Sequence, residues 1–531
     1  MNRRSSRIAV GIVAAAACTS MLSGCLGEPG GGSDAADGST SIVAVNNGEI
    51  GRITGAQNPG SQIAMALCEP LTGIEEDGAV FMRGAESLES DDQVTWTVKV
   101  ADGHTFSDGT PITAKTYVDT FNFVGAGVNA MPSNYAYGPI KGYDELNPAE
   151  GKATATEFSG ITLVDDSTFT IETKAPNNDV PYILSQLAFC PMPESAFADP
   201  LAYDKKPVGN GVYTLEKLDP QVEAVLKKDP KYQGWVPDGA ADQITFRVYT
   251  DTNTAYQDVV AGNADVLRDL PPGLIAQGRN ALGDKGLTAI DRNALAAYFA
   301  WPTYLDEKFP IEVRQAFSMI VDRETISKDL FKGATLPWGS LMPNSVDAFR
   351  EDACGRYCTF DPDAAKALIE KSGFTGTIPL NYSSESTTDA ATALAISNSA
   401  KEIGLVVEPK PVPAAALSET VNSYELDGPI IQLWGSSFPA ASEWVASVYI
   451  DANYRLKYSD PQGEAAVAAA LAAPTPDEAI AQWQKAEDRI LADQVLQPLY
   501  QQVRYIAHTP CVVPHAAGGD QQIYRTEVTC S

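Results

Sequence analysis

The sequence predicts an α/β fold divided into two or three domains. Residues 243–249 alternate apolar and polar side chains, which is typical of a half-buried strand, and residues 253–261 follow as a short helix that ends at Gly262. Strands and helices alternate along most of the chain, as they do in α/β domains. At 531 residues the chain is too long for a single hydrophobic core, so more than one domain is expected.

The N-terminus, residues 1–24, is predicted to be a lipoprotein signal peptide. Three arginines precede an apolar stretch at 8–17, which is too short to span a bilayer. The letters LSGC end at Cys25 and resemble a bacterial lipobox, in which the cysteine carries lipid and becomes the first mature residue. An ordinary secretory signal is the alternative, and the small residues directly before Cys25 favour the lipoprotein. Residues 25–40, rich in Gly, Ser and Asp, are expected to form a flexible tether.

The formal net charge of −30 argues against nucleic acid as a partner, because such a surface repels a polyanion. No run of basic residues with interleaved aromatic residues opposes this interpretation. We interpret the acidity as a contribution to solubility, and we infer nothing about the ligand from it.

Six cysteines lie beyond Cys25, and an even number in an exported protein suggests disulfides. Six cysteines allow fifteen connectivities. We expect the two pairs that are close in sequence and the pair that remains, which are Cys354–Cys358, Cys511–Cys530 and Cys68–Cys190. A zinc site is the weaker alternative, because none of the three histidines, His104, His508 and His515, has ligand spacing to these cysteines.

The elements expected before residue 206 are strands at 41–46 and 94–100, helices at 63–71 and 114–123, a hairpin at 161–173 and an apolar helix at 181–189. Apolar and polar residues alternate in the strand at 94–100. Thr113 is placed to cap the helix that follows.

The elements expected after residue 206 are strands at 212–218, 222–227, 243–249, 265–267, 294–301, 405–408, 430–434 and 497–507, and helices at 253–261, 308–332, 360–373, 389–403 and after Thr475. The helix at 360–373 has an aspartate at its N-cap, a proline at its first position and a glycine past its end. In the segment 308–332, Arg314, Asp322 and Arg323 are read as structural residues. Asp322 would cap a second helix, and the arginines would tie the helices to their neighbours.

Four short motifs occur in order at residues 207–213, 229–234, 244–248 and 259–266. They read PVGNGVY, DPKYQG, ITFRV and VVAGNADV. Together they resemble motifs of the solute-binding proteins of peptide-type ABC importers, the family of oligopeptide, dipeptide and nickel binders. The resemblance extends over roughly residues 42–524.

This resemblance implies a periplasmic-binding-protein-like, bilobed fold with an extra third domain and two hinge crossings. Domain I is then expected at about 41–75, 206–293 and 500–531, domain II at 76–205 and domain III at 294–499. The hinge crossings are expected near residues 292–295 and 497–501.

The resemblance also implies a function. We expect an extracytoplasmic, lipid-anchored protein of the cell membrane, monomeric, that captures peptides or peptide-like solutes between its lobes and delivers them to ABC permease subunits in the membrane. No cofactor and no metal is expected.

Two other classes of protein are alternatives. An enzyme is not expected, because the sequence has no nucleophile elbow, P-loop, Rossmann glycine run or HExxH motif. A structural or adhesive lipoprotein would explain the anchor but not a complete importer-type core.

Contact positions of the family can be carried over one residue at a time. Gln57 and Asn58 lie in the loop before the first helix, Tyr135 and Tyr137 lie where the family has a ligand-facing tyrosine, and Tyr500 lies near another. For each of these, a surface-loop or core role is an equal alternative.

The most informative match is LWGSSF at residues 433–438, where the family's peptide binders read W-x-x-D-Y. Trp434 is retained, and Gly435, Ser436 and Phe438 are carried over as contact positions. Ser437 stands where the family has an aspartate that holds the peptide's α-ammonium group. A hydroxyl can accept a hydrogen bond but cannot form an ion pair. Peptides remain the expected ligand, and an oligosaccharide or another non-peptide metabolite is the alternative.

Overall fold

The computed structural model describes residues 40–283, 285–450 and 454–530. The predicted signal peptide, Cys25 and the tether up to residue 39 lie outside these ranges. Within them, no helix combines the length and the apolar character needed to cross a membrane.

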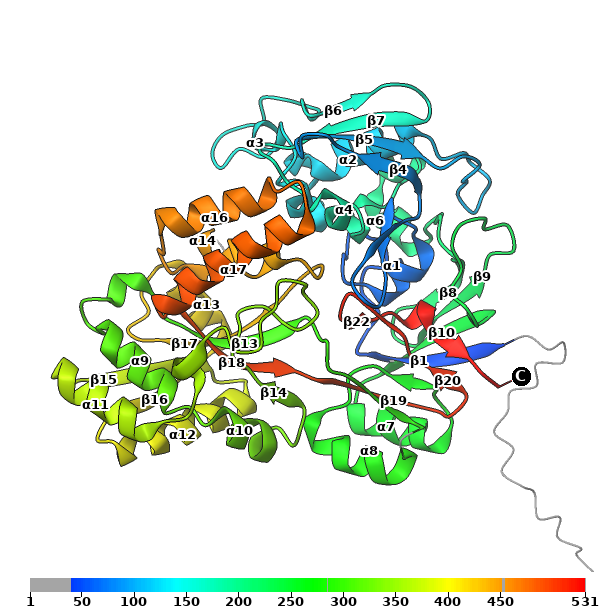
Figure 1. Cartoon of the computed structure of the whole chain (residues 1–531). Coiled ribbons are helices and arrows are strands. Elements are labelled where there is room, and N and C mark those ends of the chain that lie inside the picture. Colours follow the sequence, from blue (N-terminus) through cyan, green and yellow to red (C-terminus); the bar gives the residue numbers. More distant parts are fainter. Residues whose placement is uncertain (1–39, 284, 451–453, 531) are drawn as a thin grey trace, which may run out of the picture. The chain divides into compact units, whose positions relative to one another are not determined.

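A seven-stranded mixed sheet contains the first strand of the described chain and one of the last (Figure 1). In sheet order its strands are β12 (Leu287–Ile290), β19 (Arg504–His508), β11 (Val266–Leu267), β1 (Ser41–Asn47), β10 (Gln243–Tyr249), β9 (Glu223–Lys228) and β8 (Tyr213–Asp219). Strand β1 runs parallel to β10 and β11, and the other pairs are antiparallel. The helices of this part are α1 (Gln62–Leu67), α7 (Thr252–Ala261) and α8 (Ile275–Leu282). The predicted strand at 243–249 is confirmed, and α7 ends at Gly262, whose φ of +77° is the left-handed conformation that suits glycine.

A four-stranded antiparallel sheet is built from residues 85–172. Its order is β4 (Ala85–Glu89), β5 (Thr95–Val100), β7 (Thr168–Glu172) and β6 (Ile161–Leu163). Helix α2 (Ala114–Gly125) packs against it, and its N-terminus carries the expected cap at Thr113, which forms a capping box with Thr116. Short helices complete this part: α3 (Tyr143–Leu146), α4 (Val180–Ile183), α5 (Ser195–Ala198), α6 (Pro200–Lys205), and the 3-10 helices η1 (Gly127–Asn129), η2 (Pro132–Tyr137) and η3 (Leu187–Phe189).

The prediction of one helix over 181–189 is wrong. Helix α4 ends at Ile183, and the backbone becomes extended at Gln186 before η3 begins. This break brings Cys190 to Cys68 at the end of α1, and the two form a disulfide.

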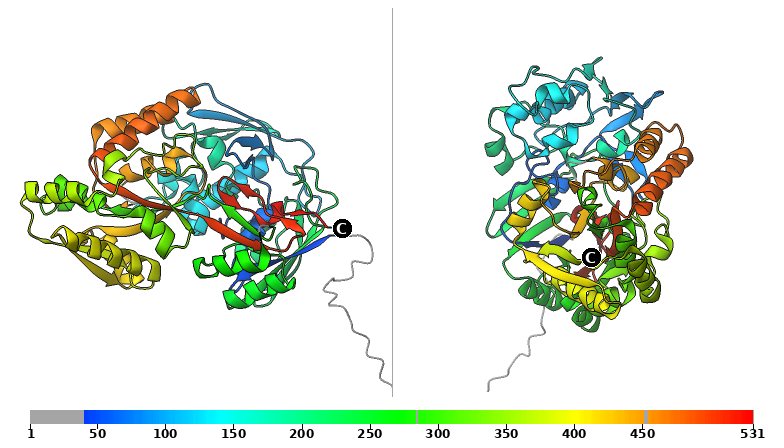
Figure 2. Two further views of the ribbon diagram at one scale, coloured as in Figure 1. Left: turned by 60° about the horizontal axis from the view of Figure 1, so that its bottom comes forward. Right: turned by 90° about the vertical axis from the view of Figure 1, so that its left-hand side faces the viewer.

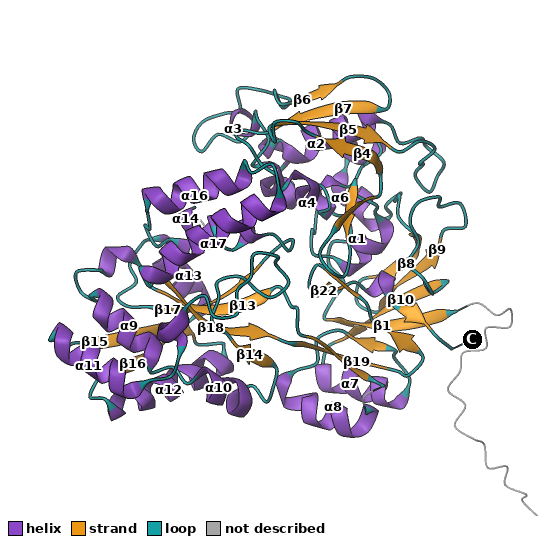
Figure 3. Cartoon of the chain, viewed as in Figure 1, coloured by secondary structure: helices purple, strands orange, loops and turns teal. Residues whose placement is uncertain are grey.

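A six-stranded mixed sheet has the order β14 (Thr335–Pro337), β18 (Leu496–Gln502), β13 (Leu295–Ala300), β17 (Ile430–Gly435), β15 (Thr377–Ser383) and β16 (Val406–Val412). Helices lie along this sheet and beyond it (Figure 3): α9 (Ile311–Met319), α11 (Pro362–Ser372), α12 (Thr387–Glu402), α13 (Ala414–Asn422), α14 (Ala446–Tyr449), α16 (Pro461–Leu471) and α17 (Pro476–Ala492). The 3-10 helices of this part are η5 (Thr303–Leu305), η7 (Gly355–Cys358) and η8 (Ala441–Glu443), whereas η4 (Pro272–Leu274) contacts α8 and η9 (Ile523–Arg525) contacts α1.

In the predicted helical segment 308–332, α9 is followed by a second helix. Asp322 caps α10 (Arg323–Thr325) by accepting a hydrogen bond from the Thr325 N–H at 2.9 Å, as expected, and the π-helix η6 (Ile326–Leu330) follows. Arg323 is buried and donates to the backbone oxygens of Pro498 and Cys358, so its role in tying segments together is confirmed.

The chain passes between the seven-stranded and the six-stranded sheet at two places. One lies between β12 and β13, at residues 291–294, close to the expected position. The other lies at Val503, between β18 and β19. Figure 2 shows these two consecutive strands passing from one sheet to the other. The expected crossing at 497–501 is therefore displaced, because residues 497, 498, 500 and 501 pair within the six-stranded sheet.

Three disulfides join the six cysteines in the pairs expected from the sequence: Cys68–Cys190, Cys354–Cys358 and Cys511–Cys530. They leave no thiolate among these residues for zinc. No group of three or more histidine, cysteine or acidic side chains could hold a metal ion in the part of the chain that the structure describes.

Candidate ligand-binding site

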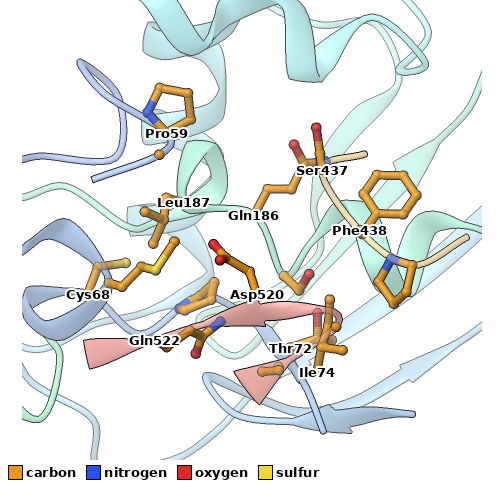
Figure 4. Close-up of a pocket in the computed structure, with 18 of the residues that line it drawn as sticks. Pro59, Cys68, Thr72, Ile74, Gln186, Leu187, Ser437, Phe438, Asp520 and Gln522 are labelled. Atoms are coloured by element: carbon orange, nitrogen blue, oxygen red, sulfur yellow. The ribbon is translucent and has the colours of Figure 1, made fainter. Parts of the chain in front are cut away.

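A cavity of about 320 Å³ lies where segments from the whole chain meet (Figure 4). One wall comes from α1, from the loop before it and from the hairpin of β2 (Thr72–Ile74) and β3 (Val80–Met82). The turn at 185–187 and the loop 436–439 after β17 supply further walls. The C-terminal segment at 517–525 also lines the cavity. A site built from several separate segments of two sheets is typical of small-molecule binding.

Four residues predicted as ligand contacts line this cavity: Tyr135, Ser436, Ser437 and Phe438. Tyr135 lies on η2 and is 58% exposed, so its ring is open to a ligand. Phe438 is buried and stacks on Tyr182, with 5.8 Å between the ring centroids. The loop after β17 is therefore the part of the predicted site that the structure brings to the cavity.

Tyr137 and Tyr500 do not line the cavity. Tyr137 has no exposed surface, and its hydroxyl donates to the Ala188 carbonyl at 2.7 Å. Tyr500 is 4% exposed and packs on Phe331, with ring centroids 4.6 Å apart. Both rings are core residues in this structure.

The other predicted contacts lie near the cavity without lining it. Trp434 stacks on Tyr454 at 4.5 Å, and its indole N–H donates to the Glu443 carbonyl at 2.9 Å. Gly435 is exposed at the end of β17. Gln57 and Asn58 lie in the loop before α1, where their side chains contact neighbouring chain segments.

Three charged residues line the cavity that were not expected from the sequence: Arg83, Asp520 and Arg525. The two arginines lie 5.6 Å and 4.8 Å from the ring centre of Trp235, and Arg83 Nη1 donates to the Tyr524 hydroxyl at 3.2 Å. No motif marks them, because Arg83 and its partner Tyr524 are 441 positions apart in the sequence.

The hairpin of β21 (Ala516–Ala517) and β22 (Asp520–Gln521) presents Asp520 to the cavity. Its turn is Gly518-Gly519, with φ of +56° and +87° at the two positions. A Cβ at Gly519 would lie 2.6 Å from the Arg292 carbonyl oxygen, so only glycine fits beside the chain crossing. This Gly-Gly pair was the one sequence signal for the hairpin.

The cavity lies beside a contact between the segment around α4 and the six-stranded part. Asn178 Nδ2 donates to the Ala470 carbonyl at 2.9 Å, and the Asp179 carboxylate meets the Ser442 hydroxyl. Burial raises the pKa of Asp179 to about 6, and burial also raises the pKa of Glu443. Glu443 Oε2 accepts the Ser437 N–H at 2.9 Å. The carboxylates of Asp179 and Glu443 are thus both held where the two segments pack together and water has little access.

The remaining strands of the C-terminal segment, β20 (Val512–Val513) and β23 (Glu527–Val528), pair with each other. His515 lies between them and the hairpin, and its ring nitrogens meet Glu76 and Glu527 at 2.7 Å and 3.4 Å. His104 meets Glu69 at 3.7 Å, and His508 meets the Thr288 hydroxyl at 2.9 Å. Each histidine thus has a partner within the protein.

Comparisons with known proteins bear on what this arrangement does. A family model described as "Bacterial extracellular solute-binding proteins, family 5 Middle" matches residues 82–455. The chain is 26% identical over 339 residues to the "Periplasmic oligopeptide-binding protein OppA" of Salmonella typhimurium, covering 61% of this chain and 60% of that protein. The matched region thus spans less than two thirds of that relative's length.

Two solved structures are similar over nearly the whole chain. One is the MppA periplasmic murein tripeptide binding protein in its unliganded open form, with a TM-score of 0.80, 18% identity and coverage of 92% of this chain and 98% of that chain. The other is Haemophilus influenzae OppA in complex with the peptide RPPGFSPFR, with a TM-score of 0.70, 19% identity and coverage of 93% and 100%. At these identities the likeness shows the fold, and the predicted periplasmic-binding-protein-like α/β fold is confirmed.

Proposed function

Because the chain belongs to the bacterial extracellular solute-binding proteins of family 5, we propose that it binds peptides or peptide-like solutes in this cavity and delivers them to an ABC permease. Proteins of this family bind solutes and are not enzymes. The observation that carries the proposal is the cavity itself, where the loop after β17 faces α1 and the C-terminal hairpin. The oligopeptide-binding relatives, one of them solved with a nonapeptide, support peptides as the ligand class.

A ligand screen tests the ligand class. Purified protein is mixed with tripeptides, oligosaccharides and metal chelates, and the melting temperature is measured for each. A ligand at about 100 times its dissociation constant adds roughly 2.7 kcal/mol to the folded state, which is readily seen as a shift. Peptides should raise the melting temperature. A shift with oligosaccharides alone would replace the peptide proposal by the alternative that the missing aspartate at Ser437 favours.

We propose that the two crossings, at residues 291–294 and at Val503, act as a hinge between domains I and III, with domain II at 76–205. The three sheets divide among these segments, which supports the division. Hinged closure around a ligand is a common transition in periplasmic binding proteins. Small-angle scattering should give a smaller radius of gyration with the peptide found in the screen, and an unchanged radius at saturation would refute the hinge.

We also propose that Cys25 carries the lipid that holds the protein on the extracytoplasmic face of the membrane. The apolar stretch and the LSGC sequence before it support this proposal. Cys25→Ala should release the protein from the membrane fraction and abolish labelling with a fatty-acid analogue. A variant that stays in the membrane fraction would show that another feature anchors the chain.

A further inference from the structure

Asp520 is the most exposed of the three charged residues that line the cavity in the described part of the chain. Its side chain is 38% exposed, whereas those of Arg83 and Arg525 are 5% and 8% exposed. Figure 4 shows the Asp520 carboxylate pointing from β22 into the space beside Leu187 and Gln186. Asp520 is therefore the charged group of the cavity wall that a ligand reaches most easily.

The two arginines of the cavity are already engaged by the protein. Arg83 donates to the Tyr524 hydroxyl and lies 3.8 Å from Glu69 Oε1, and Arg525 donates to the Ile74 carbonyl at 2.9 Å. Arg83 Nε and Nη2 have no hydrogen-bond partner among the described residues, but both atoms are buried, so a ligand reaches little of either guanidinium group. The cavity is therefore better suited to a cationic group than to an anionic one.

The two oxygens of Asp520 have different surroundings. Oδ1 is buried, contacts Arg504 Nη1 and lies 3.7 Å from Arg268 Nη2. Oδ2 has no polar partner within the described ranges. Asp269 completes the set, with Oδ1 at 2.9 Å from Arg504 Nε and Oδ2 at 3.3 Å from Arg268 Nε. One edge of the Asp520 carboxylate is thus fixed from behind by two arginines, and the other edge remains available as an acceptor.

The hairpin that carries Asp520 is held in place. Gln521 is fully buried next to it, the Gly518 N–H donates to the Glu75 carbonyl at 3.3 Å, and Gly519 abuts the crossing at Arg292. A binding group on a supported element needs little reordering when a ligand arrives. Asp520 is therefore a preorganised acceptor.

We infer that Asp520 Oδ2 accepts the ammonium group of the bound solute. The inference rests on the proposed function and narrows it to peptides with a free primary amine, at the N-terminus or on a lysine side chain. A hydrogen bond between an ammonium group and a carboxylate is about twice as strong as a neutral one. Asp520 would supply from the C-terminal hairpin the acidic group that Ser437 does not supply from the loop after β17.

Glu443 is the rival acid on this side of the molecule. It does not line the cavity, and one of its oxygens accepts the Ser437 N–H. Its neutral variant, Glu443→Gln, is therefore a control that removes a nearby charge without removing the cavity carboxylate. Asp269→Asn is the second control, because it disturbs the same arginines from outside the cavity.

The test uses the full chain and two forms of one tripeptide library made without arginine. In one form all amines are free, and in the other all α-amines and lysine amines are acetylated. Apparent dissociation constants are measured by native mass spectrometry for wild type, Asp520→Asn and both controls. Asp520→Asn should weaken binding of the free library by about tenfold or more, while its binding of the acetylated library matches wild type. A tenfold change corresponds to about 1.4 kcal/mol.

Each other outcome is decisive. If wild type binds both libraries equally well, or if Asp520→Asn weakens both equally, Asp520 does not bind an ammonium group, although the peptide proposal stands. If Asp269→Asn weakens the free library as much as Asp520→Asn does, the effect belongs to the arginines and the inference is overturned. If wild type binds neither library, the proposed function itself fails. Should Asp520→Asn not fold, the preference of wild type for free amines decides, and its absence refutes the inference.

Discussion

Replacing Asp179 by asparagine should stabilise the folded protein at neutral pH. Asp179 is 8% exposed and lies at the start of α4, where its carboxylate faces the Ser442 hydroxyl and lies near Glu443. Burial disfavours the charged form of Asp179 and raises the pKa of this carboxyl to about 6. The hydrogen bond from Ser442 lowers the pKa, and the nearby negative charge of Glu443 raises it. Asparagine has nearly the same shape, keeps a partner for Ser442 and carries no charge.

The magnitude and its sign follow from the difference in proton binding between the folded and unfolded chain. Above pH 6 the Asp179 carboxylate is charged in both states. In the folded protein burial disfavours that charge, whereas in the unfolded chain water solvates it. As the pH falls from 6 toward 4, the folded state takes up a proton before the unfolded state does, so this destabilisation is relieved. The difference between about 6 and the ordinary value of 3.8 corresponds to roughly 3 kcal/mol. Asp179→Asn should recover most of this free energy at pH 7.5 and little of it at pH 4.

Urea-induced unfolding at several pH values between 4 and 8, followed by two probes to test for a single transition, measures the effect. Asp347→Asn is the matched control, because Asp347 is an exposed acid near the same ring of Tyr182 and should change stability by no more than about 0.5 kcal/mol. An Asp179→Asn variant with wild-type stability at pH 7.5, or with the wild-type pH dependence between 4 and 6.5, would show that the carboxylate is better solvated than its burial indicates.

Two further sets of substitutions test interactions that stabilise the fold. Glu487 is fully buried and accepts hydrogen bonds from the Leu341 N–H and from Arg350. Glu487→Ala should therefore lower the free energy of unfolding by about 3–5 kcal/mol. Asp488 lies at the exposed side of the same arginine, and Asp488→Asn should lower the free energy of unfolding by no more than about 1 kcal/mol. Equal losses in denaturant titrations would contradict the burial argument. Replacing both Cys68 and Cys190 by serine opens a link across 122 residues and should lower stability by about 3–5 kcal/mol, while the same change in the disulfide that spans four residues should have a clearly smaller effect. Similar shifts in melting temperature for the two double variants would refute this ranking.

Residue patterns within a short stretch of sequence predicted β10 and α11. The strand β10 alternates apolar and polar residues along its full length, and α11 has an N-cap, an initial proline and a terminal glycine, so both were predicted to within a residue or two. The crossing at Val503 could not be found in this way. Residues 496–502 and 504–508 are both strands rich in apolar residues, and which sheet each one joins depends on partners hundreds of residues away.

The same limit applies to the site. An aromatic residue looks the same in sequence whether it fills a core or faces a ligand, and so Tyr137 and Tyr500 were expected at a cavity that they do not reach. The loop at 436–438 was found because it follows a recognisable strand in a motif with a family counterpart. Asp520 has no such context, since its position depends on a turn that packs beside the chain crossing at residues 292–294.

The position of β19 has a consequence for the order in which the chain can fold. This strand, at residues 504–508, lies between β12 and β11 in a sheet that begins at residue 41. The sheet cannot close until almost the whole polypeptide has left the ribosome, and contacts of such long sequence separation slow folding. Until then β11 and β12 have unpaired edges, which are sites of non-native pairing. A chain truncated shortly before residue 504 would lose an interior strand of this sheet, and it would be a substrate for proteases and chaperones.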